Sequence, residues 1–456
     1  MASWVKERRR PGWRLPALLL GVLVLGAAAC TPHRKLYPRL HALAGQAKFA
    51  EAAKLVEASR SDYGDRNEVL YNLDRGVFHH YAGNYAASNR AFELAEQRID
   101  DLYTESLAGH VGAFLINDNT LPYRGEDFEG VMINIYRALN YIQLGNVDEA
   151  LVEARKVNEK LLFINRQYEP DKQNVYSEDA FARMLMGVFY EIGGTRDDLN
   201  DAFISNRLAV KAYEQNFAQL YGVTLPTVLK SNLVTTADFM GENDFALAKQ
   251  RFPQVEALRL SEKGKLGQLF FIHFAGRGPV KVESSITALM PNGRLFKIAF
   301  PQYRSNFYLI HSSRILVEGV AKADLEVAEP VGPIAIKNLE NRKGRIAAKA
   351  IARATTKYVA ALALEQQARK RGGDLAGLVA RVAGSVFTFV TEKADLRAWQ
   401  TLPDKILVGQ VSLKPGAYRV AVQFLSSGGA VFQTRQLGTI EVKAGTTKFF
   451  ILHSNS

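Results

Sequence analysis

Small, apolar and aromatic residues recur at helical spacing through the first half of the chain, between about Leu36 and Phe217. Small residues let two antiparallel helices approach closely, and an aromatic residue fills the space between neighbouring helix pairs. Further copies of the pattern run from Ala138 to Val157 and from Gly187 to Ala209, and a partial copy lies at Phe49 to Ala53. The pattern predicts stacked helix pairs, an α-solenoid, over residues 30–225. Its clearest copy consists of Gly76, Gly83, Tyr85, Phe92 and Ala95.

The pattern changes near Pro226. From Val255 onward, short runs rich in β-branched and aromatic residues are separated by glycine, proline and asparagine. Turn sequences such as Pro291-Asn292-Gly293 separate neighbouring runs, as expected for strands joined by tight connections. These runs predict an antiparallel β-sandwich built from residues 226–340 and 394–456.

Residues 341–393 lie between the two strand blocks and have helical spacing instead. Four basic residues recur every four positions, which places their charges on one helix face. After Gly372-Gly373, the stretch from Leu375 to Val390 is almost uncharged. We predict a helical hairpin inserted into the sandwich, and hence a multidomain protein of α and β parts. The four basic residues are Arg345, Lys349, Arg353 and Lys357.

Residues 1–29 have the pattern of a secretion signal. Basic residues precede an apolar stretch from Leu15 to Ala29, which is too short to cross a bilayer as a mature helix. The stretch ends Leu-Gly-Ala-Ala-Ala-Cys, and Cys30 is the only cysteine of the chain. This junction resembles the lipobox of bacterial lipoproteins. The alternative is an ordinary signal peptide followed by an incidental cysteine.

The lipobox resemblance implies that residues 1–29 are removed and that Cys30 carries diacylglycerol and a further acyl chain such as palmitate. More than one acyl chain is needed for stable anchoring. Thr31 stands where a retention signal would have aspartate. By resemblance to Gram-negative sorting, the expected location is the outer membrane, with the protein facing the periplasm. No other cofactor is expected.

Charge narrows the range of partners. Removal of residues 1–29 takes away five basic residues and one acidic residue, so the net charge falls from +12 to +8. A basic protein in the periplasm meets phospholipid head groups, lipopolysaccharide and peptidoglycan rather than nucleic acid. Because the only cysteine is expected to be lipidated, no intramolecular disulfide is predicted.

No enzyme motif is present in the sequence. A phosphate-binding Walker loop, a G-x-S-x-G elbow, an H-E-x-x-H helix and a cysteine pair are all missing. His79 and His80 are adjacent, and neighbouring positions on a helix point apart, so they make a poor metal clamp. We therefore predict no catalytic residue and no metal site.

The most distinctive polar segment is N-D-N-T-L-P-Y-R-G-E-D-F-E, Asn117 to Glu129. One interpretation is a loop at the edge of the solenoid groove that binds a protein partner. The other is a structural connection, in which Pro122 ends one helix and acidic residues cap the next. A calcium loop is excluded because the EF-hand ligand spacing fails. The candidate partner-binding residues are Asn117, Asp118, Asn119, Tyr123, Arg124, Glu126 and Asp127.

The basic stripe of residues 345–357 has two interpretations as well. It could contact an anionic lipid or glycan surface, with the apolar stretch Leu375 to Val390 dipping into the membrane interface. The alternative is a helix whose charges are simply solvated while its apolar faces pack on the sandwich. Under the first interpretation, the contact residues are Arg345, Lys349, Arg353 and Lys357.

Four further stretches stand out beside Cys30 and the polar segment: Y-N-L-D-R-G (Tyr71 to Gly76), A-L-N-Y (Ala138 to Tyr141), V-E-A-R-K-V-N (Val152 to Asn158) and A-D-L-R-A-W-Q-T-L-P (Ala394 to Pro403). With these features, the chain after Cys30 resembles a family of bacterial tetratricopeptide-repeat-containing outer-membrane lipoproteins with no assigned activity. Relatives of this type tend to be encoded near activators of penicillin-binding proteins, which implies a link to cell-wall synthesis. We predict a non-enzymatic scaffold that binds an unidentified envelope protein through its repeats; the alternative is a glycan- or lipid-binding module that uses the sandwich and the basic hairpin.

Overall fold

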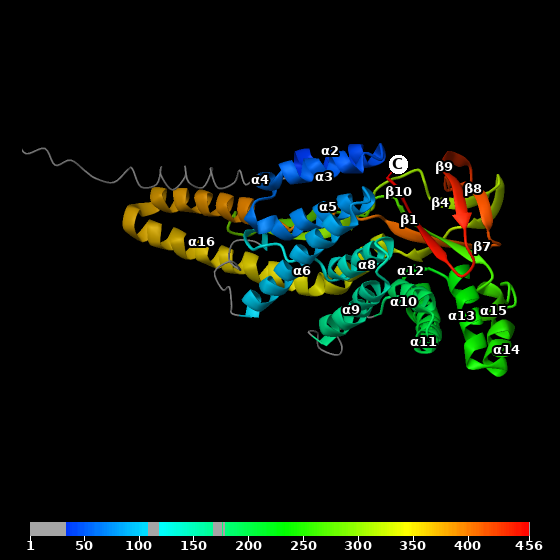
Figure 1. The fold of residues 1–456 in the computed structure, drawn as a ribbon. Coiled ribbons are helices and arrows are strands. Elements are labelled where there is room, and N and C mark those ends of the chain that lie inside the picture. The colour runs from blue at the N-terminus through cyan, green and yellow to red at the C-terminus, as the bar shows by residue number, and fades with distance from the viewer. Residues whose placement is uncertain (1–32, 108–117, 167–175, 177, 456) are drawn as a thin grey trace, which may run out of the picture.

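The computed structural model describes residues 33–107, 118–166, 176 and 178–455. The predicted signal segment 1–29, Cys30 and Asn117 lie outside the described residues. Within the described residues, a helical N-terminal part is followed by β-sheets, and a long helical excursion projects from the body of the molecule (Figure 1). The predicted combination of α and β parts is therefore confirmed.

The N-terminal part consists mainly of helices that pack as sequential antiparallel pairs, among them α5 with α6, α8 with α9 and α10 with α11. Each of these three pairs turns at a glycine with positive φ, namely Gly83, Gly145 and Gly194. Glycine adopts this backbone without steric cost. The helices are α2 (His33–Gly45), α3 (Phe49–Ala58), α4 (Arg60–Tyr63), α5 (Glu68–Tyr81), α6 (Tyr85–Leu107), α8 (Asp127–Gln143), α9 (Val147–Arg166), α10 (Ala180–Gly193), α11 (Arg196–Ala212), α12 (Ala218–Tyr221), α13 (Thr227–Met240), α14 (Glu242–Arg251) and α15 (Leu260–Lys263).

Within the described part of the chain, the strands form two four-stranded sheets and one two-stranded ribbon, in the orders β10-β1-β7-β6, β5-β4-β8-β9 and β2-β3. We call them the inner sheet, the outer sheet and the ribbon. The helix α16 (Val331–Thr391) lies between β6 and β7 in the sequence. The strands are β1 (Gly267–Ala275), β2 (Val280–Leu289), β3 (Leu295–Arg304), β4 (Ser312–Val317), β5 (Val320–Asp324), β6 (Glu326–Glu329), β7 (Lys405–Leu413), β8 (Gly416–Leu425), β9 (Val431–Val442) and β10 (Thr447–Ser454).

The central strand β1 is buried along its whole length because both of its faces are covered. Successive side chains of a strand point to opposite faces. Phe270, Ile272 and Phe274 belong to the core shared with the helices, whereas Leu269 and Phe271 belong to a second core shared with the outer sheet. The described part of the molecule therefore has three layers: helices, inner sheet and outer sheet.

The helices and the inner sheet share a single hydrophobic core. Tyr136 of α8 stacks on Phe274 of β1, with ring centroids 5.1 Å apart. Phe189 of α10 makes an edge contact with Phe449 of β10. The hydroxyl of Tyr213 donates a hydrogen bond to the carbonyl of Ala328 at 2.9 Å. The inner face of the helix pairs is thus filled by this chain's own sheet.

Three features differ from the sequence-based predictions. Helices continue through α13, α14 and α15, so the start of the segment assigned to the sandwich, from residue 226 up to β1 at Gly267, is mainly helical. The inner sheet is mixed rather than antiparallel, because β10 runs parallel to β1. The excursion begins at Val331, earlier than predicted, because its first residues pack in the shared core. The predicted break at Gly372-Gly373 is confirmed, since Gly373 has non-helical φ and ψ angles.

Candidate functional site

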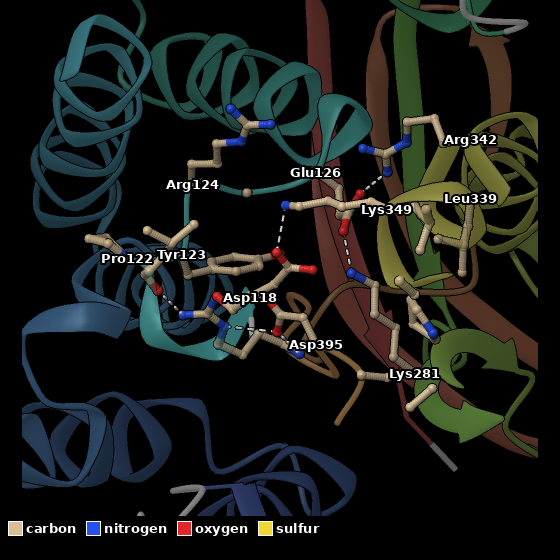
Figure 2. A pocket seen from close by; sticks show the side chains of 18 of the residues that line it. Asp118, Pro122, Tyr123, Arg124, Glu126, Lys281, Leu339, Arg342, Lys349 and Asp395 are labelled. Atoms are coloured by element: carbon tan, nitrogen blue, oxygen red, sulfur yellow. Dashed lines mark hydrogen bonds and ion pairs between the residues drawn. The ribbon is translucent and has the colours of Figure 1, made fainter. Parts of the chain in front are cut away.

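A cleft of about 320 Å³ lies where the polar loop 118–126 meets α16 and the ribbon (Figure 2). Its walls come from segments that are far apart in the sequence. Nearly half of the lining residues are charged: Asp118, Arg124, Glu126, Lys281, Arg342, Lys349, Arg353, Asp395 and Arg397. The structure therefore brings the predicted partner-binding loop and the predicted basic stripe into one place.

The conformation of the loop is set by its junction with the start of α8. Gly125 has a positive φ of 80°, which reverses the chain just before the helix. Glu126 and Glu129 form a reciprocal capping box at the helix N-terminus, and the backbone N–H of Glu126 donates to the Glu129 carboxylate at 3.1 Å. Such a box satisfies amide groups that have no partner within the helix. The structural interpretation of the acidic residues thus accounts for this part of the loop.

The Glu126 carboxylate is the most strongly paired group of the cleft. It accepts hydrogen bonds from Lys281 of the ribbon and from Arg342 of α16. Burial alone would raise the pKa of Glu126, but these two cations hold it well below its usual range. Figure 2 shows both cations converging on this carboxylate from different elements. Glu126 therefore fastens the ribbon and α16 to the start of α8.

Asp118 connects the same loop to the basic stripe. Its carboxylate accepts hydrogen bonds from Lys349 at 2.6 Å and from Arg353 at 3.2 Å. Arg353 and Lys357 also reach the buried carboxylate of Glu392, at 2.8 and 3.0 Å. Burial favours the neutral form of Asp118, but the cations prevail and lower its pKa. These contacts hold the first half of α16 against both the loop and the end of the hairpin.

The basic stripe is not one continuous exposed face, which corrects the sequence-based prediction. Arg345 and Lys349 are exposed, but Arg353 and Lys357 retain only 2% and 6% of their accessible surface. Their charges are buried because Glu392 and Asp118 compensate them, as buried cations require. Arg353 and Lys357 are therefore unavailable to an anionic surface.

The other loop residues are also mostly engaged within the protein. Asn119 donates to the carbonyl of Ala394 at 3.1 Å, and the buried Tyr123 hydroxyl donates to Glu129 at 2.6 Å. Asp127 is half-buried in the first turn of α8. Arg124 is exposed, and Figure 2 shows its side chain turned away from the ion pairs of Glu126. Of the described candidate loop residues, Arg124 is the one left free to meet a partner.

Two buried acids next to the cleft were missed by the sequence analysis. Asp74 accepts hydrogen bonds from the hydroxyls of Tyr37, Tyr63 and Thr401, each at 2.7 Å. Glu129 accepts a hydrogen bond from the backbone N–H of Trp399 at 2.7 Å. Burial raises the pKa of Asp74 to about 6 and that of Glu129 to about 7. Both acids hold the segment that precedes β7 against the helices.

The residues that make these hydrogen bonds belong to motifs that the sequence already showed. Asp74 belongs to Y-N-L-D-R-G, Glu129 ends the polar segment, and Trp399 and Thr401 belong to A-D-L-R-A-W-Q-T-L-P. These stretches stood out as motifs, but nothing in their spacing showed that they touch. Their shared role is to join the helices to the sheet.

Two carboxylates of the cleft, Asp118 and Glu126, are paired with cations that lower their pKa values, which leaves them weak as bases. Within the described residues, no group of three or more histidine, cysteine or acidic residues is placed to hold a metal ion.

No family model matches the chain, and no curated protein does either. The resemblance to tetratricopeptide lipoproteins thus stays a prediction. The functional interpretation accordingly depends on the contacts within the molecule.

Proposed function

We propose that the chain is a non-enzymatic, lipid-anchored scaffold of the bacterial envelope that binds a protein partner through its helical part. In this proposal the helix pairs are tetratricopeptide-like repeats, the two large sheets form a sandwich, and Cys30 carries the anchor at the periplasmic face of the outer membrane. The partner belongs to the cell-wall synthesis machinery, or the scaffold binds peptidoglycan itself.

The placement of the inner sheet determines where a partner can bind. The first helices of the pairs, among them α5, α8 and α10, contact the inner sheet. We therefore propose that the partner binds away from the sheet-covered side of these helices, rather than in the solenoid groove expected from the sequence. The available surface is formed by the second helices of the pairs.

The observation that supports a protein partner is a set of exposed apolar side chains on these second helices. On α9, Val152 and Leu162 lie on the same face as the exposed Arg155 and Glu159. Apolar residues set among charged ones are typical of protein-binding surfaces. The set consists of Leu94 on α6, Val152 and Leu162 on α9, Ile204 on α11 and Leu247 on α14.

Photo-crosslinking in intact envelopes tests this surface. A photoreactive amino acid at Leu162 should yield a discrete protein adduct on irradiation of the full-length lipoprotein. The matched control is the same amino acid at Val320, an equally exposed apolar position on β5 (58% against 57%). Equal labelling at both positions, or no adduct at Leu162, would contradict the proposal. Adducts that carry peptidoglycan fragments instead of protein would favour the glycan-binding alternative.

A further inference from the structure

The second arm of α16 presents its large apolar residues to solvent. Gly373, with a φ of 73°, divides α16 into two arms that fold back on each other and project from the body of the molecule (Figure 1). The exposed residues of the second arm recur three or four positions apart, which places them on one helix face. They are Leu375, Leu378, Val379, Val382, Val386 and Val390.

The opposite face of this arm carries small residues that contact the first arm. A Cβ atom added to Gly384 would lie 3.1 Å from the Cβ atom of Ala361. A Cβ atom added to Gly377 would lie equally close to the side chain of Arg369. Small residues inside and large apolar residues outside reverse the arrangement of a water-soluble helix pair. Helices that pack in lipid have this arrangement, because small residues allow close approach and the exterior is apolar.

The extent of the exposed surface also favours lipid. One stretch of α16 is long and apolar enough to cross a membrane by composition, and only 6% of it is buried within the described structure. Water-soluble proteins rarely expose so many large apolar side chains side by side without a binding partner. The surface is therefore a docking site rather than part of the core.

Charge identifies the kind of lipid. Arg369, Lys370 and Arg371 precede the turn and are all exposed, while Asp374 is the exposed acid beside them. On the first arm, the exposed Lys343 and Arg345 add to the positive charge. Basic residues that flank an apolar helix face bind anionic head groups while the apolar side chains enter the acyl region.

The position of the N-terminus is consistent with this site. Figure 1 shows that α2 begins at the end of the molecule from which the hairpin projects. His33 is only three positions after Cys30 in the sequence. A lipid on Cys30 would place the bilayer on the same side as the hairpin, and this orientation argument rests on the proposed anchor.

We propose that the α16 hairpin lies in the interface of an anionic bilayer, with the face from Leu375 to Val390 buried among the acyl chains. The hairpin lies in the interface rather than spanning the bilayer, because Arg381 and Glu365 form an ion pair between its arms at 2.7 Å. The hairpin would thus be a second membrane contact beside the lipid anchor, and it would fix the orientation of the scaffold.

The test uses the mature chain with Cys30→Ser, so that binding cannot come from the lipid. This variant has no cysteine, so Val382→Cys introduces a unique site for an environment-sensitive fluorophore. Val431→Cys on β9 is the matched control, since the two valines are 57% and 53% exposed. Vesicles of phosphatidylglycerol and phosphatidylethanolamine should shift the emission to the blue at position 382 only. Vesicles of phosphatidylcholine should give a much smaller shift.

A disrupting variant completes the experiment. Val382→Asp with Val386→Asp should weaken binding to the anionic vesicles by roughly tenfold or more, because carboxylates are costly to bury in acyl chains. Val320→Asp with Val431→Asp should bind as well as the parent, and circular dichroism should show both variants folded. No shift at position 382, or a shift on self-association without lipid, would overturn the proposal. Palmitate labelling of wild type and Cys30→Ser tests the anchor separately.

Discussion

Glu126 and Glu129 lie three residues apart in one capping box, yet their surroundings shift the pKa values of their carboxyl groups in opposite directions. Both are buried, which disfavours the charged form. Glu126 faces Lys281 and Arg342, and these cations outweigh the cost of burial. Glu129 faces Glu126 and neutral donors, so burial prevails and raises its pKa to about 7. The two positions therefore contribute to stability in different pH ranges.

Glu129 should make the protein less stable as the pH rises. Between 4.5, its ordinary pKa, and about 7, folded Glu129 keeps a proton that the unfolded chain has released. The free energy of unfolding thus decreases across this window, by at most roughly 3 kcal/mol from this group. In Glu129→Gln this group cannot titrate, so the decrease should be smaller. Urea unfolding at both ends of the window measures the difference.

Asp118→Asn is the matched control for this prediction, because Asp118 does not act on the pKa of Glu129, whereas the Glu126 charge helps to raise it. The lowered pKa of Asp118 keeps its carboxylate charged across the whole window. Its loss should reduce stability by a similar amount at both ends and leave the pH dependence unchanged. The assignment would be wrong if Glu129→Gln retained the full pH dependence of the wild type.

At the scale of elements, the periodicity of the sequence predicted features that depend on residues close together along the chain. Small residues such as Gly76 were predicted to let paired helices approach closely, and Phe92 of α6 does pack over Gly76 of α5. The break at Gly373 was likewise visible in the sequence. The partners of Asp118 and Glu126 were not, because Arg353 and Arg342 lie more than two hundred residues away. Spacing along a chain carries no information on contacts of that kind.

The close approach at Gly76 gives a test of the helix pairing. A Cβ atom at this position would lie 2.5 Å from the Phe92 ring, which is itself fully buried. Gly76→Ala should therefore destabilise the protein by about 1–3 kcal/mol through overpacking. Gly344→Ala is the control, because a Cβ atom there meets nothing within 4 Å and the residue is helical. This control should be neutral or stabilising by up to about 1 kcal/mol.

Thermal or urea unfolding of the two alanine variants decides the outcome. The same substitution should move stability in opposite directions at the two sites, which separates packing from helix propensity. If Gly76→Ala were as stable as Gly344→Ala, the close contact between α5 and α6 would not exist as described.

At the scale of the whole molecule, the inner sheet unites the two halves of the chain. Phe274 of β1 contacts His80, Tyr81 and Tyr136, which come from α5 and α8. The buried acids Asp74 and Glu129 add hydrogen bonds from the helices to Thr401 and Trp399. The change of hydrophobic pattern near Pro226 indicated two separable parts, because a pattern does not reveal that two apolar faces bury each other.

The helical part alone should therefore not behave as a stable domain. A fragment from Thr31 to Gly222 would expose the apolar faces of α5, α8 and α10 that the inner sheet covers. We expect it to retain helical circular dichroism but to melt without cooperativity and to bind a hydrophobic dye, as a chain without its packing partner does. Coexpression with residues 223–456 should restore a soluble complex with a cooperative transition. A sharp, reversible melt of the isolated fragment would show instead that the helices carry a core of their own and that the sheet is merely docked on it.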